Sequence, residues 1–427
     1  MRTGRAVIIA AVAALLAACG PPQVQQAGPA VDERTGTLRV WLFDEANRGP
    51  KQATVDEAVS RFEHEHPGVD VDVQYIAVET RSERFTGAFN DPASAPDVAE
   101  VGNTDLAGYV AAGGLADLTE KLPQWPESAD LSPSALDTAR VDGKVFGVPW
   151  YTGVRALYYR TDVFAELGLQ PPRTTGELLA TAQRIHEQRP DLYGIATGGK
   201  YHYALMPFIW AAGGDLARQE GRRWVSAIDS PEAQRGIATY ARLISSGACP
   251  PEQCADMTGS QSVQAFASGK AAMTIGGDFN RKAVDAGVPG KYGVVPLPGD
   301  QPGSTAPAFA GGNLLSVLKS SQRATLAREF VQLLAGKEYQ RRMYDAMGNL
   351  PTFLDVQSEV ADRDPAAAPF VRTLRGGTHF VPATAAWSTI DAQGVLPTMV
   401  QRIVGGTPVP EAAGQAAASM NAAFEGR

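Results

Sequence analysis

The chain has few of the residues that most often bind metals. Only three cysteines and five histidines occur among its 427 residues. Two of the histidines form His64-Glu65-His66, but residues two apart on a helix point to different sides. Pro67 follows directly, and helices usually end before a proline, so we interpret the cluster as a solvated helix end. We therefore expect no metal and no cofactor.

Positive charge is also scarce. The chain has 38 lysines and arginines against 46 aspartates and glutamates, which gives a formal net charge of −8. Proteins that bind nucleic acid need basic patches to neutralise phosphates. We expect no nucleic-acid partner.

The motifs of several enzyme classes are missing. Gly290-Lys291 lacks the upstream glycine of a phosphate-binding loop, because Asp285 stands there, and no Gly-x-Ser-x-Gly nucleophile motif occurs. We therefore expect a protein that is not an enzyme and has no catalytic residues. The paired carboxylates of glycoside hydrolases are recognised by their separation in space, so an extracytoplasmic glycosidase stays open as an alternative.

No apolar run reaches the roughly 20 residues that span a bilayer. The N-terminus instead has Arg2 and Arg5, then an uncharged, apolar stretch over 6–18, which is typical of an export signal. The letters LAACG at 16–20 resemble a bacterial lipobox, with cleavage before Cys19 and acylation of that residue. We predict a signal peptide at 1–18 and a lipidated Cys19 with a flexible tether at 19–37, which anchor the protein to the outer face of the cell membrane. The alternative is an ordinary secretory signal with a chance cysteine.

The other two cysteines are Cys249 and Cys254. Leftover cysteines in an exported protein favour a disulfide. A zinc site is the alternative, but no second cysteine pair or nearby histidine completes four ligands. We predict a local disulfide.

Alternating strand and helix patterns predict an α/β fold. Strands are predicted at 38–43, 69–75, 96–101 and 271–275, and a helix with Val55, Ala58 and Phe62 on one face lies between the first two. Further helices follow Ser230-Pro231 and Ser320-Ser321. The mature chain exceeds the size at which single cores divide, so two lobes are expected.

Several motifs resemble carbohydrate-type solute-binding lipoproteins of ABC importers, the maltose-binding-protein-like family 1. These are GKVFGVPWYTGVRALYYRTD at 143–162, FAELGL at 164–169, PPRT at 171–174, FASGKAAM at 266–273 and AGGN at 310–313. The resemblance implies a type II periplasmic-binding-protein-like fold, with crossing strands at a hinge and the ligand in an interlobe cleft. We place lobe 1 at 38–151 plus 313–350 and lobe 2 at 152–312 plus 351–427.

The resemblance also implies the function. The protein is expected to bind a sugar, either malto-oligosaccharide-like or another oligosaccharide, by interlobe closure and to deliver it to membrane permease subunits. It is expected to act as a monomer. A lipid-anchored sugar sensor is a further alternative.

Sugar sites need aromatic platforms and polar side chains at strand ends. Trp387 resembles the family's final stacking tryptophan, whereas Trp41 lies in a strand and is expected in the core. Position 101, a stacking residue in maltose binders, is valine here, so the sequence departs from the maltose-binding pattern at this position. The candidate ligand contacts are Glu45, Asn47, Asn103, Asp105, Trp150, Tyr151, Tyr201, Tyr203, Asp278, Phe279, Gly312, Asn313 and Trp387.

Overall fold

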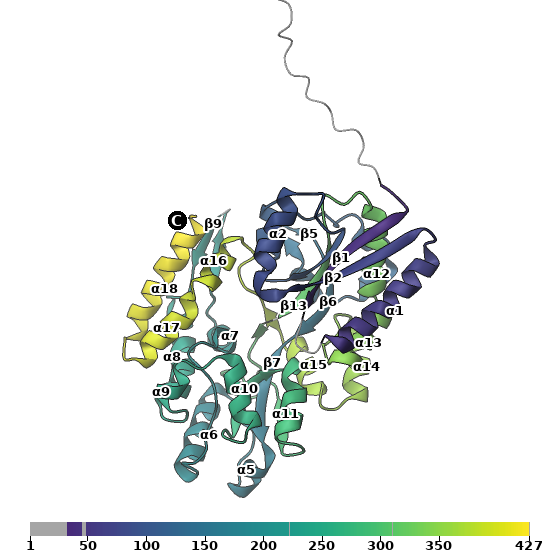
Figure 1. Cartoon of the computed structure of the whole chain (residues 1–427). Helices are drawn as coiled ribbons and strands as arrows, with labels where there is room; N and C mark the ends of the chain where they lie inside the picture. Colours follow the sequence, from purple (N-terminus) through teal and green to yellow (C-terminus); the bar gives the residue numbers. More distant parts are fainter. Residues whose placement is uncertain (1–31, 45–47, 222, 310, 427) are drawn as a thin grey trace, which may run out of the picture.

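The computed structural model describes residues 32–44, 48–221, 223–309 and 311–426. These ranges form two α/β units, each with its own sheet and helices (Figure 1). Within them, no helix combines the length and apolar character needed to cross a membrane. Cys19, Glu45 and Asn47 lie outside the described residues, so what was predicted for them stays a prediction.

The first unit is built on a five-stranded sheet in the order β2-β1-β3-β13-β6. Strands β1 (Gly36–Asp44), β2 (Val69–Ala77) and β3 (Val98–Gly102) are parallel, and β13 (Gly311–Val317) runs antiparallel to both β3 and β6 (Val148–Gly153). The first three match the predicted strands within two residues at each end. Val69 and Val71 are buried while Asp70 and Asp72 are exposed, so the alternation in the sequence reports one face of the sheet.

The helices of the first unit cover this sheet. In α1 (Gly49–Glu65) the predicted face of Val55, Ala58 and Phe62 is buried. The other helical segments are η1 (Val78–Thr80), α2 (Arg81–Asn90), α3 (Leu106–Ala111), η2 (Leu122–Gln124), η3 (Pro126–Asp130), α4 (Pro133–Asp137), α12 (Ala324–Leu334) and α13 (Lys337–Met347). Two short strands, β4 (Arg140–Val141) and β5 (Lys144–Val145), pair with each other.

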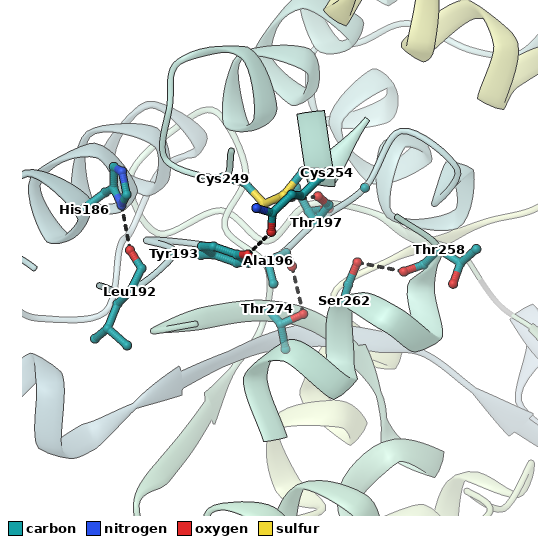
Figure 2. Close-up of a disulfide and its surroundings, with 12 residues drawn as sticks. His186, Leu192, Tyr193, Ala196, Thr197, Cys249, Cys254, Thr258, Ser262 and Thr274 are labelled. Carbon is teal, nitrogen blue, oxygen red and sulfur yellow. Dashed lines mark hydrogen bonds between the residues drawn. A yellow bond between two sulfur atoms is a disulfide. The ribbon is translucent and has the colours of Figure 1, made fainter. Parts of the chain in front are cut away.

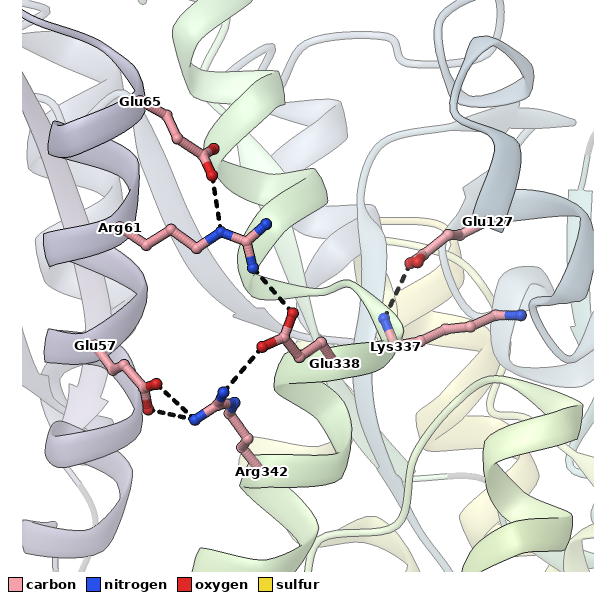
Figure 3. Close-up of polar contacts among 7 residues, drawn as sticks. All are labelled: Glu57, Arg61, Glu65, Glu127, Lys337, Glu338 and Arg342. Carbon is pink, nitrogen blue, oxygen red and sulfur yellow. Dashed lines mark hydrogen bonds and ion pairs between the residues drawn. The ribbon is translucent and has the colours of Figure 1, made fainter.

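Helix α13 comes late in the chain but lies against α1 (Figure 3). Arg61 of α1 donates to Glu338 at 2.9 Å, and Arg342 of α13 donates to Glu57 at 2.6 Å. Such exposed ion pairs contribute little to stability. The buried apolar cluster of this unit, which includes Phe62 and residues of α12 and α13, therefore holds the late segment in place.

The second unit has β7 (Arg155–Arg160) between β10 (Met273–Gly277) and β11 (Tyr292–Val295), both antiparallel to β7. The strand predicted at 271–275 thus lies two residues later. Ser230 begins α8 (Pro231–Ser245) and accepts a hydrogen bond from the Ala233 N–H, as an N-cap does. The remaining elements here are α5 (Thr161–Glu166), α6 (Thr175–Gln188), α7 (His202–Ala211), β8 (Ala217–Glu220), β9 (Arg223–Ser226), α9 (Pro251–Cys254), α10 (Gly259–Ala267), η4 (Asp278–Asn280), α11 (Arg281–Gly287), β12 (Ala308–Phe309), α14 (Leu354–Arg363), α15 (Ala368–Arg375), β14 (Thr378–His379), α16 (Ala386–Ala392), α17 (Val395–Val404) and α18 (Val409–Phe424).

Three segments pass between the units, and they lie together. The first runs from β6 to β7 through Val154, the second enters β13, and the third joins α13 to α14. Gly153 pairs with Gly311, and the Thr152 N–H donates to the Leu350 carbonyl at 2.9 Å. The crossing segments therefore form one small region that joins the two units.

The third crossing ends later than the sequence suggested. Phe353 and Val356 were assigned to lobe 2, but both pack in the apolar cluster of the first unit. Phe353 meets the Trp125 ring edge-on with centroids 5.8 Å apart. Val360, one turn further, packs in a different cluster with residues of the second unit.

Candidate functional site

A pocket of about 350 Å³ opens where the crossing segments meet. All three segments contribute to its wall, and the turn after β10 supplies the rest. The lining residues are Tyr151, Thr152, Gly153, Arg155, Asp278, Phe279, Phe309, Gly311, Gly312, Asn313 and Asn349. The wall therefore combines aromatic rings, amides and backbone, which is the mixture found in small-molecule sites.

Glycine lets two of the crossing segments approach each other. A Cβ added to Gly312 would lie 2.4 Å from the carbonyl oxygen of Tyr151, and 3.1 Å from the Thr152 Cα. These neighbours are backbone atoms of an adjacent strand, so they have little freedom to yield. Gly312 is therefore needed for the pairing of β13 with β6 beside the pocket.

Arg155 lies among aromatic rings at the pocket wall. Its guanidinium carbon is 4.9 Å from the centroid of the Tyr203 ring and 5.6 Å from the centroids of Tyr201 and Phe279. Its Nε donates to the Tyr201 hydroxyl at 2.9 Å. Contacts of this kind hold a cation over ring faces and fix its position.

Phe279 is the most exposed large apolar side chain in the described part of the chain, with 51% of its surface accessible. It follows β10 in the 3-10 turn η4, and Asp278 before it is buried. The turn thus points one side chain inward and presents the next one to the pocket. An exposed ring of this size is a candidate platform for an apolar face of a ligand.

Asp278 ties this turn to the first crossing segment. Its Oδ1 accepts the Val154 N–H at 2.9 Å, and its own N–H donates to the Val154 carbonyl at 3.2 Å. Burial raises the pKa of Asp278 to about 7, although hydrogen bonds to the carboxyl from the N–H groups of Val154 and of Asp278 itself, together with the charges of Arg155 and Arg281, lower it. The carboxyl is therefore close to half protonated near neutral pH.

A second aromatic group continues from the pocket. The Tyr203 ring lies 4.9 Å from Phe309, and Phe309 stacks on Phe380 with centroids 5.8 Å apart. Burial raises the pKa of Tyr203 to about 12, and the charge of Asp105 on the first unit adds to this shift while Arg155 opposes it.

The chain matches a family model described as bacterial extracellular solute-binding protein over residues 46–341. It is 26% identical over 425 residues to the diacetylchitobiose binding protein DasA of Streptomyces coelicolor, with 97% of each chain covered. It is 26% identical to the galactooligosaccharide-binding protein of Bacillus subtilis, covering 83% of this chain and 81% of the other. The sugar-binding protein MalE of Xanthomonas citri has a similar structure, with a TM-score of 0.81, 25% identity and coverage of 92% and 98%.

The chain belongs to the bacterial extracellular solute-binding protein family. Its fold is the two-lobe, MalE-like fold that the resemblance implied. Proteins of this family bind solutes.

Five of the contact residues predicted from the sequence line the pocket. Tyr203 does not line it, but its ring contacts the lining residue Phe309. The five are Tyr151, Asp278, Phe279, Gly312 and Asn313. They come from motifs at 143–162 and 310–313 and from the turn after β10, so the placement of strand ends in the sequence was informative.

Other predicted contacts have buried side chains that the pocket does not reach. Trp150 packs in the core of the first unit, and Tyr201 packs in the second while its hydroxyl holds Arg155. Asp105 is bound to Arg81, with Oδ2 2.7 Å from Nε. Asn103 is buried too, and its N–H donates to the carbonyl of Gly312 at 3.1 Å.

Trp387 does not occupy the position expected of a stacking residue. Only 1% of its surface is accessible, and it packs with Ile390 in the core of the second unit. The two residues are three positions apart on α16, so they share one helix face, and that face is turned inward. Trp41, expected in the core, is buried.

The predicted contacts did not include six of the lining residues, which are Thr152, Gly153, Arg155, Phe309, Gly311 and Asn349. Arg155 had a signal, because it is a charged residue within the otherwise uncharged run VRALYY at 154–159. Phe309 stands two residues before the glycine pair of AGGN, and Asn349 had no signal of its own.

Cys249 and Cys254 are paired in the structure, and the pair lies beside the segment that leads to Tyr201 (Figure 2). The Gly199 N–H donates to the Cys254 carbonyl at 2.9 Å. A Cβ on Gly199 would lie 2.1 Å from the Ala255 carbonyl oxygen, so the two loops are in close contact. Among the residues that the structure describes, no group of three or more histidine, cysteine or acidic side chains could hold a metal.

Proposed function

We propose that this protein binds an oligosaccharide in the pocket between its two units and delivers it to the permease of an ABC importer. The observation that carries the proposal is Phe279, an aromatic ring that is half exposed in a pocket whose wall also carries polar side chains and backbone groups. A sugar presents a C–H face that covers such a ring and hydroxyls that need polar partners. The relatives support this, since several are described as binding oligosaccharides.

The pocket favours a binding protein over the glycosidase alternative. Glycoside hydrolysis usually needs two carboxylates on either side of the scissile bond. Asp278 is the single carboxylate among the described lining residues, and its Oδ1 accepts a backbone hydrogen bond. This arrangement supports the binding of a neutral sugar that is released without hydrolysis.

The test is calorimetry with a ligand panel. Maltotriose, N,N′-diacetylchitobiose and a galactooligosaccharide represent the sugar classes considered. At least one is expected to bind, and mass spectrometry after prolonged incubation should recover it intact. Absence of binding across the panel would count against an oligosaccharide ligand, and hydrolysed sugar would favour the enzyme.

The division into lobes is part of the proposal. We place lobe 1 at 38–151 plus 313–356 and lobe 2 at 152–312 plus 357–427, which moves the last boundary beyond Val356 because of its packing. Ligand contacts from both sides of the pocket would favour the closed arrangement. Small-angle scattering with and without a bound sugar should show a more compact particle when the sugar is present.

Lipid anchoring through Cys19 completes the proposal and rests on the sequence LAACG. Buried acyl chains hold a protein at a membrane by about 0.8 kcal/mol per methylene. Replacing Cys19 by alanine is expected to release the protein from cell membranes into the medium. Sedimentation of the variant with membranes at the wild-type level would contradict the anchor.

A further inference from the structure

Glu100 lies behind the pocket wall and touches neither solvent nor the pocket directly. It is fully buried on β3, and its partner Lys51, on α1, is fully buried as well, with Nζ 2.9 Å from Oε2. Oε2 also accepts the Phe43 N–H at 2.7 Å. The same lysine donates to the Phe43 carbonyl at 3.2 Å. This half of the carboxylate is therefore held by the first unit alone.

The other oxygen of Glu100 faces the pocket wall. Oε1 accepts the Tyr151 hydroxyl at 2.6 Å and the Asn313 side-chain amide nitrogen at 2.5 Å. That nitrogen also donates to the Tyr151 oxygen at 2.6 Å. Tyr151 and Asn313 both line the pocket, and they come from different crossing segments, β6 and β13.

The chemistry of a carboxylate fixes which way Asn313 points. A carboxylate paired with an ammonium group, as Glu100 is with Lys51, only accepts hydrogen bonds. An asparagine beside it must turn its NH₂ group inward. Its Oδ1 then points away from Glu100 and accepts no hydrogen bond from the described part of the chain. The pocket wall at this point offers an acceptor.

We infer that Glu100, charge-balanced by Lys51, is a positioning residue that locks Asn313 with its oxygen toward the ligand, so that this wall selects a ligand group that donates a hydrogen bond. This deepens the proposed function, since a sugar hydroxyl or an acetamido N–H is such a donor. A ligand with only acceptors at this position would leave two oxygens facing each other without a proton.

A polarity swap tests the inference. In Glu100→Gln the new NH₂ group confronts the NH₂ of Asn313, so the asparagine is expected to flip and binding to weaken at least tenfold. In Glu100→Gln with Asn313→Asp, the glutamine NH₂ donates to the aspartate, its oxygen still meets Lys51 and Phe43, and the net charge is that of the wild type. Affinity for the panel sugar that binds best should return to within about threefold of wild type.

Asn313→Asp alone gives a second signature. Two carboxylates in contact share a proton, so this variant should lose more affinity between pH 5.5 and pH 8 than wild type and the double variant, which have in common with it only the titration of Asp278 in the pocket wall. Phe330→Leu, a core change in the same unit, controls for lost stability: it should lower the unfolding midpoint and leave affinity unchanged. Glu100→Gln with wild-type affinity, or a double variant that stays as weak as the single one, would overturn the inference.

One measurement needs no ligand and separates this inference from the proposed function. The side-chain NH₂ signals of Asn313, assigned by their loss in Asn313→Asp, should exchange slowly with solvent in the wild-type protein because both hydrogens are bonded. They should exchange at least tenfold faster in Glu100→Gln. Fast exchange in the wild type would refute the orientation even if a sugar binds, and slow exchange would uphold it even if every sugar in the panel fails.

Discussion

Replacing Phe279 and replacing Trp387 are expected to have opposite effects on sugar binding and on stability. Phe279 is 51% exposed in the pocket, whereas Trp387 is 1% exposed in the core. A phenylalanine side chain offers on the order of 200 Å² for burial, so about 100 Å² remains for a ligand to cover. At about 25 cal/mol per Å² this is roughly 2.5 kcal/mol of binding free energy. Phe279→Ala should therefore weaken sugar binding about 50-fold.

The same substitution should cost little stability, because half of the ring is already in water. Trp387→Ala should instead lower the free energy of unfolding by about 3–5 kcal/mol, which is usual for removing a large buried side chain. Calorimetry for affinity and urea unfolding for stability, measured on both variants, separate the two roles. Trp387→Leu, which keeps an apolar group in the core, should recover part of the stability.

The reasoning would be refuted by the reverse result. If Phe279→Ala bound sugar normally while Trp387→Ala lost binding at an unchanged urea midpoint, the stacking surface would lie at Trp387, as the sequence resemblance implied. Loss of both properties in both variants would show that pocket and core cannot be separated in this way.

Other predictions follow from groups around the pocket. The folded protein should bind more protons than the unfolded chain between about pH 4 and 7, because burial raises the pKa of Asp278 from 3.8 to about 7, so stability should fall by up to roughly 4 kcal/mol as pH rises through this window. Asp278→Asn should remove most of that slope in urea titrations. Gly312→Ala should cost about 1–3 kcal/mol of stability, because its Cβ would meet backbone atoms, and unfolding together with calorimetry should show binding fall as well. Intact mass under non-reducing, denaturing conditions should show no alkylatable thiol at Cys249 or Cys254, and replacing both by serine should cost at most about 2–3 kcal/mol; two free thiols would contradict the bond.

Several strands and helices, and five of the residues that line the pocket, could be predicted from the amino-acid sequence. Period-two alternation in β2 and the face of α1 follow from one-sided burial, which is a local property and can be read from neighbouring residues. Gly312 and Asn313 were predicted because AGGN resembles the family's return crossing between the lobes, where glycine lets the backbone approach a ligand closely.

The exposure of Phe279, the burial of Trp387 and the contacts of Glu100 behind the pocket wall depend on tertiary packing and could not be predicted from the sequence. Phe279 follows Gly276-Gly277-Asp278 in the sequence, and Trp387 follows Pro382. Their burial differs because Phe279 stands at the junction of the two units, whereas Trp387 faces the inside of one. Glu100 is a charged residue within the buried strand β3, and the sequence alone does not indicate which residues pair with it. Its partners lie 49, 51 and 213 residues away, and no local pattern encodes contacts over such separations. They exist because strands from distant parts of the chain pair in one sheet, and the pocket is built at their ends.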